Sequence, residues 1–203
     1  MDKQDIIEFF DRLAPDWDNN LIHDDSKINA ILDYADIVKG VSVLDVACGT
    51  GVLIPDYLAR NVENVTAVDI SPKMIIAARK KFRDPRVRFI NADIETADFP
   101  GLFDRCVVYN AFPHFPNPQN LIRSLAGRLI PGGRLTICHG MSRKKINAHH
   151  NNSANKVSMG LMSEIELSEL FKAYFDADTV LSNDEIFVVS GIKHPNASGH
   201  SFN

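Results

Sequence analysis

The stretch VLDVACGTGVLIP, at residues 43–55, carries an acid and two glycines in an order that suits ligand binding. An apolar run ends at Asp45, small residues that include Gly49 and Gly51 follow, and an apolar helical pattern then resumes. Strand, glycine loop and helix suggest a nucleotide-type site, because open α/β sheets bind ligands outside the carboxyl ends of their strands. The dinucleotide pattern G-x-G-x-x-G fits poorly, since Ile54 occupies its third glycine position. An acid at this strand end favours a cation over a pyrophosphate.

Two more acids follow apolar runs further along the chain. Asp69 ends the run VTAVDI, 24 positions after Asp45, where one carboxylate can accept hydrogen bonds from both hydroxyls of a ribose. A helix-capping role for Asp69 is the weaker interpretation, because Ser71 already occupies the capping position. Asp93, in the segment NADIE, is on its own equally typical of a turn.

Four histidines are candidates for the surroundings of a reacting group. His114 follows the fourth apolar run, His139 ends the fifth, and His149 and His150 lie in the polar segment 140–161. Each alone is typical of a surface or hydrogen-bonded histidine. Together they favour a general base or a bound divalent metal that orients a substrate. Metal-ligand spacing is poor, because His149 and His150 are adjacent and no cysteine or acid completes a pattern, so the metal question stays open.

Apolar, β-branched runs alternate with helical patterns along most of the chain. The alternation predicts an α/β fold, a Rossmann-like doubly wound sheet of about seven strands, mostly parallel with a C-terminal antiparallel hairpin strand. Ser71 with Pro72, and the capping box SEIE at residues 163–166, mark two helix starts. Further helices are expected from about residue 51 and over 119–129, followed by a Pro-Gly-Gly turn. The expected strands are 41–46, 65–70, 87–90, 103–110, 134–140, 177–182 and 185–191.

The N-terminal residues predict an amphipathic helix that covers the sheet domain. Its buried side is expected to carry Ile6, Ile7, Phe9, Phe10 and Leu13. Because acids interrupt its apolar residues, the segment resembles neither a signal peptide nor a membrane span. We expect a single domain over residues 1–193 and a disordered tail over 194–203. The polar segment 140–161 is long for a connector and is predicted to be a lid or binding segment.

Charge and cysteine content narrow the class of partner. The net charge is −4 and the basic residues are scattered, which disfavours nucleic acid and favours a small-molecule substrate. Cys48, Cys106 and Cys138 lie in or beside apolar runs, as free thiols do in a reducing cytoplasm. No membrane partner is expected. The sequence leaves two interpretations of the final hairpin open. Its edge is either exposed and forms a homodimer, or it is covered by another part of the chain.

The segment LDVACGTG resembles motif I of class I S-adenosylmethionine-dependent methyltransferases, and AVDISPKM, NADIE and VVYNAFPHF follow in the order of that family. Asp45 matches the acid of the motif and Ala47 replaces its first glycine. The resemblance covers about residues 41–140 and implies S-adenosyl-L-methionine as cofactor. It also implies that Gly49 and Gly51 let the backbone approach the methionine part, whose ammonium group Asp45 faces.

The other motifs imply further contacts with this cofactor. By resemblance, Asp69 binds the ribose, with Ile70 and Met74 in the same loop segment. Asp93 receives the adenine amino group, and Ile94 supplies an apolar edge.

The N-terminal segment FFDRLAPDWDN resembles the FDRIAxxYD segment of methyltransferases of the menaquinone and ubiquinone type. There Trp17 takes the place of an aromatic residue that closes over the cofactor, although a core tryptophan is the alternative. Asn110 matches a family position near the methyl acceptor and the cofactor. NAFPHF departs from the NPPY of enzymes that methylate amino groups of nucleic-acid bases, which argues against DNA methylation.

The predicted function is therefore methyl transfer from S-adenosylmethionine to a small-molecule acceptor. Alternatives are a non-catalytic or metal-dependent S-adenosylmethionine-binding protein and, least favoured, a nicotinamide-dependent oxidoreductase. Tyr109 is expected to pack in the core. The catalytic candidates are His114, His139 and Asn110, and the candidate acceptor contacts are Phe112, His114, Phe115, His139, His149 and His150.

Overall fold

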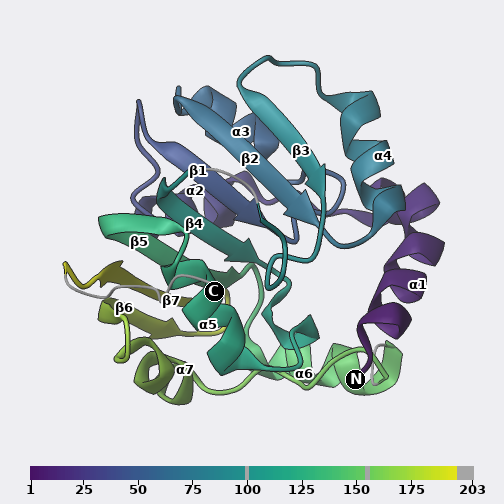
Figure 1. Cartoon of the computed structure of the whole chain (residues 1–203). Helices are drawn as coiled ribbons and strands as arrows, with labels where there is room; N and C mark the ends of the chain where they lie inside the picture. The colour runs from purple at the N-terminus through teal and green to yellow at the C-terminus, as the bar shows by residue number, and fades with distance from the viewer. Residues whose placement is uncertain (99–100, 154–155, 196–203) are drawn as a thin grey trace.

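The computed structural model describes residues 1–98, 101–153 and 156–195, which form a seven-stranded mixed sheet with helices on both faces (Figure 1). The spatial order of the strands is β3, β2, β1, β4, β5, β7, β6. The first five pair in parallel, and β7 is antiparallel to both β5 and β6. This arrangement confirms the predicted fold class, including the C-terminal hairpin. The strands are β1 (Ser42–Val46), β2 (Asn64–Asp69), β3 (Val87–Asn91), β4 (Phe103–Tyr109), β5 (Leu129–His139), β6 (Phe175–Ser182) and β7 (Phe187–Lys193).

Helices cover the sheet on both sides because the central strands are apolar on both faces. In β1, Val43 packs in one core cluster with α2, α3 and α4, whereas Leu44 packs in the other with α5 and α7. Parallel strands buried in this way appear in sequence as unbroken apolar runs. The helices are α1 (Lys3–Leu13), α2 (Asp25–Tyr34), α3 (Ile54–Ala59), α4 (Pro72–Lys81), α5 (Pro118–Ala126), α6 (Arg143–Ser153) and α7 (Glu164–Phe171), with 3-10 helices η1 (Ala14–Asn20) and η2 (Phe112–His114).

Two predicted helix starts are confirmed in detail. The Ser71 hydroxyl accepts the Met74 N–H at 3.2 Å, and Pro72 is the first residue of α4. At α7, the Ser163 hydroxyl accepts the Glu166 N–H while the Glu166 carboxylate accepts the Ser163 N–H. These side chains satisfy backbone donors that the first turn of a helix leaves open.

The predicted Pro-Gly-Gly turn lies within a strand. β5 begins at Leu129, and the ladder with β4 pairs Phe103 with Leu129 and then Arg105 with Arg134. An advance of five residues along β5 therefore pairs with an advance of two residues along β4. Residues 131–133 form a bulge, and the ladder continues on both sides of it. The preceding helix accordingly ends at Ala126, before the predicted residue 129.

Two helices were not predicted from the sequence. In α6, within the segment predicted to be a lid or binding segment, Ile146 is the buried apolar side chain among the described ones, so apolar periodicity is nearly missing. Polar contacts hold α6 instead, since the Asn147 amide bonds both the N–H and the carbonyl of Leu161. The start of helix α2 was predictable from an N-cap residue, because the Asp24 side chain accepts the Lys27 N–H at 3.1 Å.

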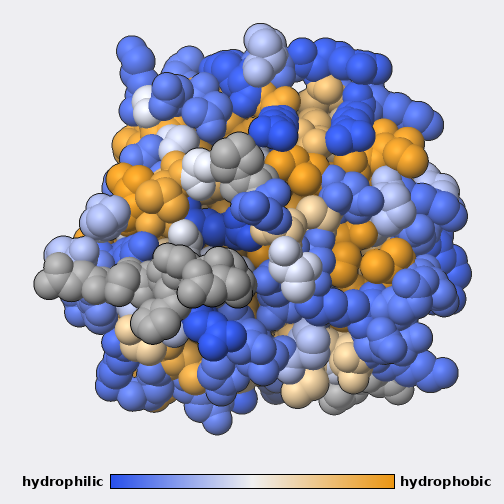
Figure 2. Space-filling view, in the orientation of Figure 1, coloured by the Kyte–Doolittle hydropathy of each residue, from blue (hydrophilic) through white to orange (hydrophobic). Residues whose placement is uncertain are grey.

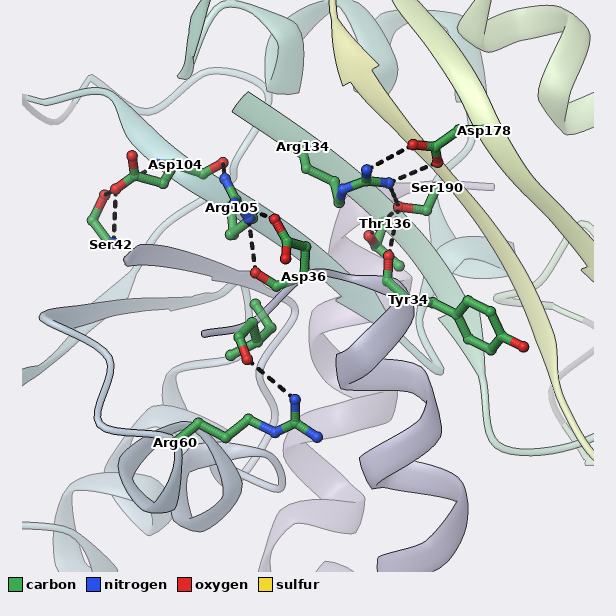
Figure 3. A network of polar contacts seen from close by, with 11 residues as sticks. Tyr34, Asp36, Ser42, Arg60, Asp104, Arg105, Arg134, Thr136, Asp178 and Ser190 are labelled. Carbon is green, nitrogen blue, oxygen red and sulfur yellow. Dashed lines mark hydrogen bonds and ion pairs between the residues drawn. The ribbon is translucent and has the colours of Figure 1, made fainter. Parts of the chain in front are cut away.

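A polar network fastens the end of α2 to the amino-terminal ends of the strands (Figure 3). Arg105 on β4 donates to the carbonyl and the carboxylate of Asp36, which follows α2. Ser190 on β7 donates from its hydroxyl to the Tyr34 carbonyl at 3.2 Å and accepts from Arg134 at 3.0 Å. These contacts leave the opposite, carboxyl-terminal end of the parallel strands for other elements.

Helix α1 lies beside that carboxyl-terminal end, to the right of the sheet in Figure 1. In the same view, Figure 2 shows apolar side chains reaching the surface among polar ones in the region of α1. Of the predicted buried side of α1, Ile6 is fully buried and the other four residues are half-buried. The helix is therefore a cover with a partly open apolar face.

The predicted C-terminal tail falls mostly on residues 196–203, outside the described residues. His194, which was included in that prediction, donates its N–H to the Tyr174 carbonyl at 2.9 Å. Within the described ranges, no helix is long and apolar enough to span a membrane.

Candidate functional site

A cavity lies where the carboxyl ends of β1, β2 and β4 meet α1 and η1. Most of the residues predicted to bind a cofactor line it, and they come from separate segments of the chain. Predicted residues in the lining are Trp17, Asp45, Ala47, Gly49, Asp69, Ile70, Met74, Asp93, Ile94, Asn110, His114 and Phe115.

Asp45 is a buried acid at the end of β1, with 2% of its surface exposed. Burial, and then the charge of Asp69, raise the pKa of Asp45 to about 8. Burial likewise raises the pKa of Asp69 to about 6, although backbone N–H groups oppose the shift. Among the described residues, no lysine or arginine forms an ion pair with either carboxylate. The pair is therefore suited to a ligand that brings positive charge.

Asp69 joins the first two loops of the site. Its Oδ2 accepts the Gly49 N–H at 2.8 Å, and its Oδ1 accepts the Ser71 N–H at 2.8 Å. A carboxylate oxygen can accept a second hydrogen bond, so both oxygens keep capacity for hydroxyl groups of a ligand. Asp69 thus fixes the glycine loop against the start of α4 while it lines the cavity.

The small residues of the loop have different physical roles. Ala47, at the position of the family glycine, has φ +54°, and Gly49 has φ +56°. Gly51 has φ +86°, and a Cβ there would lie 2.8 Å from the Phe82 ring. Gly51 therefore allows close packing against Phe82, and it is not among the described lining residues. Its predicted cofactor contact remains a prediction.

Asp93 and Glu95 line another end of the cavity, where Lys3 of α1 contacts both. The Lys3 Nζ lies 2.5 Å from Asp93 Oδ2 and 2.8 Å from Glu95 Oε2. Sequence analysis missed Lys3 and Glu95. The helical spacing could have indicated that Lys3 faces the interior, because Lys3 shares a helix face with the buried Ile6 and with Phe10, three and seven residues later.

Aromatic residues of α1 and η1 cover the glycine loop. The Trp17 Nε1 lies 3.9 Å from the point that a Cβ on Gly49 would occupy, and the Trp17 ring meets Phe10 edge to face at 5.9 Å. Asp18 holds η1 in place, because it accepts from the Thr50 hydroxyl at 2.5 Å and from Lys81 at 2.7 Å. Trp17 therefore lies beside the glycine loop, and its contact with a cofactor remains a prediction.

The end of β4 and η2 form the remaining side. Asn110 adopts φ +54°, and its Oδ1 accepts the Gly140 N–H at 3.0 Å, which joins the ends of β4 and β5. The His114 Nδ1 lies 2.6 Å from the Val157 carbonyl, and its ring meets Phe10 edge to face at 4.9 Å. A carbonyl only accepts, so Nδ1 carries the proton, and Nε2 is the basic nitrogen of the neutral ring.

Several predicted acceptor contacts are not in the described lining. Phe112 is 2% exposed and packs in the core, whereas Phe115 lines the cavity. His139 is also 2% exposed, and its ring meets Phe187 edge to face at 6.0 Å. The side chains of His149 and His150 lie outside the described residues. Within the described ranges, no group of three or more histidine, cysteine or acidic side chains could hold a metal ion.

Tyr109, expected to pack in the core, does so and also lines the cavity. A Cβ on Gly140 would lie 2.7 Å from its hydroxyl oxygen. The glycine therefore gives Tyr109 its space. Further residues that line the cavity without having been predicted are Ile6, Phe10, Leu21, Cys48, Val52, Leu53, Val68, Ala92, Ala111 and Pro116.

Comparison with known proteins identifies the central part of the chain. Residues 43–133 match the Methyltransferase domain family Methyltransf_25. An uncharacterized methyltransferase of Mycobacterium tuberculosis is 35% identical over 122 residues, which cover 60% of this chain and 59% of that protein. Residues 43–133 are therefore similar to a methyltransferase domain. The mitochondrial ubiquinone biosynthesis O-methyltransferase of Schizosaccharomyces pombe is 30% identical over 146 residues, 64% of this chain and 53% of that protein.

A solved structure shares the fold over nearly the whole chain. A magnesium protoporphyrin IX methyltransferase of Synechocystis, solved with bound S-adenosylhomocysteine, has a TM-score of 0.71 at 15% identity and covers 95% of this chain and 100% of its own. The resemblance to class I S-adenosylmethionine-dependent methyltransferases is confirmed, and the predicted alternatives find no support. The chain spans somewhat more than half the length of the curated relatives it matches.

Proposed function

We propose that this protein transfers a methyl group from S-adenosylmethionine to a small-molecule acceptor. One observation carries the proposal. The acids at or just after the ends of β1, β2 and β3, namely Asp45, Asp69 and Asp93, line one cavity together with Gly49. Their separate positions in the chain have no common local role, so convergence on one cavity favours one ligand with several polar groups.

The donor set fits the proposed cofactor. Asp45 is a buried carboxylate suited to the ammonium group of the methionine part. Asp69 has hydrogen-bonding capacity for the ribose hydroxyls, and Asp93 accepts donors at the end where the adenine amino group belongs. Gly49 leaves the cavity wall without a side chain, and Met74 and Ile94 supply apolar surface. When bound, S-adenosylmethionine supplies an electrophilic methyl group on a cationic sulfur.

The chain's own contribution is to orient the reactants and exclude water. Phe10 and Trp17 cover the cavity from the N-terminal segment, and Asp18 fixes that segment to Thr50. Holding two reactants in line replaces a costly encounter in solution, and a covered site protects the transfer from water.

His114 is the proposed general base. Its Nδ1 donates to the Val157 carbonyl, which orients the ring and makes Nε2 the basic nitrogen that would take a proton from a hydroxyl, thiol or carbon acid. Phe10, Leu21, Phe115 and Pro116 line the same cavity, so its wall favours a largely apolar acceptor. We expect no nucleic-acid acceptor.

Calorimetric titration with S-adenosylmethionine and S-adenosylhomocysteine tests the cofactor assignment. Asp69→Asn is expected to weaken both affinities about 10- to 100-fold, because a hydrogen bond to a charged group contributes about 1.5–3 kcal/mol. Asp176→Asn is the matched control, since Asp176 lies exposed on the edge strand β6. Unchanged affinity in Asp69→Asn would remove the ribose assignment.

Transfer of a labelled methyl group to a panel of small phenols, thiols and amines then tests catalysis. Turnover of at least one acceptor is expected. Tight cofactor binding without transfer to any acceptor would contradict the catalytic part of the proposal.

A further inference from the structure

Lys3 is the cationic side chain in the described lining of the cavity, and it contacts two acids at once. Asp93 and Glu95 are close in sequence and partly buried, with side chains 21% and 11% exposed. Two carboxylates in such a setting repel each other, and desolvation disfavours their charges. The Lys3 ammonium relieves both effects and holds the Asp93 carboxylate in one orientation.

The helix that carries Lys3 also forms the wall at the other side of the cavity. Phe10 meets His114 edge to face at 4.9 Å and Trp17 at 5.9 Å. Lys3 and Phe10 are seven residues apart, two helical turns, so they lie on the same face of α1. One rigid element thus contacts the acid pair at one end and the candidate general base at the other.

A third contact fixes where α1 can move. The Asp11 carboxylate accepts from the Ser71 hydroxyl at 2.6 Å and from the Lys73 N–H at 3.1 Å, at the start of α4. This contact holds the C-terminal part of α1, while the Lys3 ion pairs hold its N-terminal part. Loss of the Lys3 contacts would therefore let the rigid helix tilt about the Asp11 contact, which would turn Phe10 relative to His114.

We propose that Lys3 is a positioning residue of the cofactor site, which fixes Asp93 for the adenine base and, through α1, couples occupancy of that end to the placement of Phe10 beside His114. The inference rests on the proposed function of the cavity. The cavity lining contains four carboxylates, Asp45, Asp69, Asp93 and Glu95. This role of Lys3 accounts for its ion pairs with Asp93 and Glu95.

Titration with S-adenosylhomocysteine tests the first half of this proposal. Lys3→Met keeps most of the aliphatic stem and removes the charge, and it is expected to weaken binding about tenfold, the equivalent of about 1.4 kcal/mol. Lys3→Arg is expected to restore most of the affinity, because a guanidinium also pairs with carboxylates. The matched control is Lys27→Met. Lys27 lies on α2 and also pairs with two acids, Glu185 at 2.5 Å and Asp24 at 3.7 Å. The control should bind as the wild type does.

The tryptophan fluorescence tests the coupling, because Trp17 is the only tryptophan of the chain. Saturating S-adenosylhomocysteine is expected to protect Trp17 from acrylamide quenching in the wild type and less so in Lys3→Met. Since the ligand is saturating, the difference reports how Phe10 of α1 packs on Trp17 rather than the affinity.

The outcomes separate the two proposals. No binding by the wild type overturns the function proposed for the cavity. Binding by the wild type with equal affinity and equal protection in Lys3→Met overturns the role of Lys3, as does an equal loss in Lys27→Met. If Lys3→Met does not fold, Glu95→Gln removes one partner of the lysine and should give a smaller loss of affinity and protection, and wild-type behaviour of that variant would refute the coupling.

Discussion

Raising the pH from 6 to 8 is expected to tighten the binding of S-adenosylhomocysteine, because the buried Asp45 must be ionised to pair with the ammonium group of the ligand. Burial and the charge of Asp69 raise the pKa of Asp45 to about 8 in the ligand-free protein. At pH 7 about nine tenths of the protein then carries a proton on this acid. Binding must remove that proton, so the affinity falls as the pH falls.

The magnitude follows from the pKa alone. For one group with a pKa of about 8, the apparent affinity changes about 50-fold between pH 6 and pH 8 and levels off above pH 8. Below pH 6, protonation of Asp69, whose pKa is about 6, steepens the dependence. Near pH 7 each bound ligand should release about 0.9 proton.

Calorimetry in phosphate and in Tris measures this release, because the two buffers take up a proton with different heats. The apparent binding enthalpies should differ by the difference in buffer heat multiplied by the protons released. Adenosine is the matched ligand, since it lacks the ammonium group and should release no proton at Asp45. Asp45→Asn should bind more weakly and lose most of the pH dependence between pH 6 and pH 8. Equal enthalpies in both buffers, with an affinity constant from pH 6 to pH 8, would refute the reasoning.

The same pKa shift has a consequence for the ligand-free fold. The pKa of Asp45 is raised above its ordinary value of 3.8, so the folded state binds more protons than the unfolded state between about pH 4 and pH 8. Stability of the ligand-free protein should therefore fall as the pH rises through this window. Saturating ligand should reduce the fall, because it supplies the missing positive charge.

Two further predictions follow from the site. His114→Gln should lower methyl transfer about 100-fold or more at neutral pH, the contribution of a general base, while calorimetry finds nearly unchanged affinity for S-adenosylhomocysteine; an equal rate in the variant would remove His114 from the mechanism. Ala47→Gly should stabilise the protein by about 0.5–1 kcal/mol, because a φ of +54° costs a residue with a Cβ about 1–2 kcal/mol, partly offset by the greater chain entropy of glycine. Thermal unfolding should then shift upward by about 1–4 °C, and a lower midpoint would contradict the strain argument.

The sequence alone determined the elements that support the site. Apolar runs such as Val43 and Leu44 in β1 indicate strands buried on both faces, and Ser71 and Ser163 mark helix starts through local hydrogen bonds. Asp45 and Asp69 were predictable as site residues because both end a strand of a parallel sheet, whose carboxyl ends share one edge. These signals are local, so neighbouring residues suffice to detect them.

Only the tertiary structure decided which side chains of a loop or helix reach the cavity. Phe112 and Phe115 are three residues apart around the single turn of η2, yet one packs in the core and the other lines the cavity. His139 ends a strand as predicted, but packing against β7 directs it to Phe187. Lys3 reaches Asp93 across 90 positions of sequence. Such contacts depend on where α1 and β7 dock, and no repeating pattern in the chain encodes a contact between distant segments.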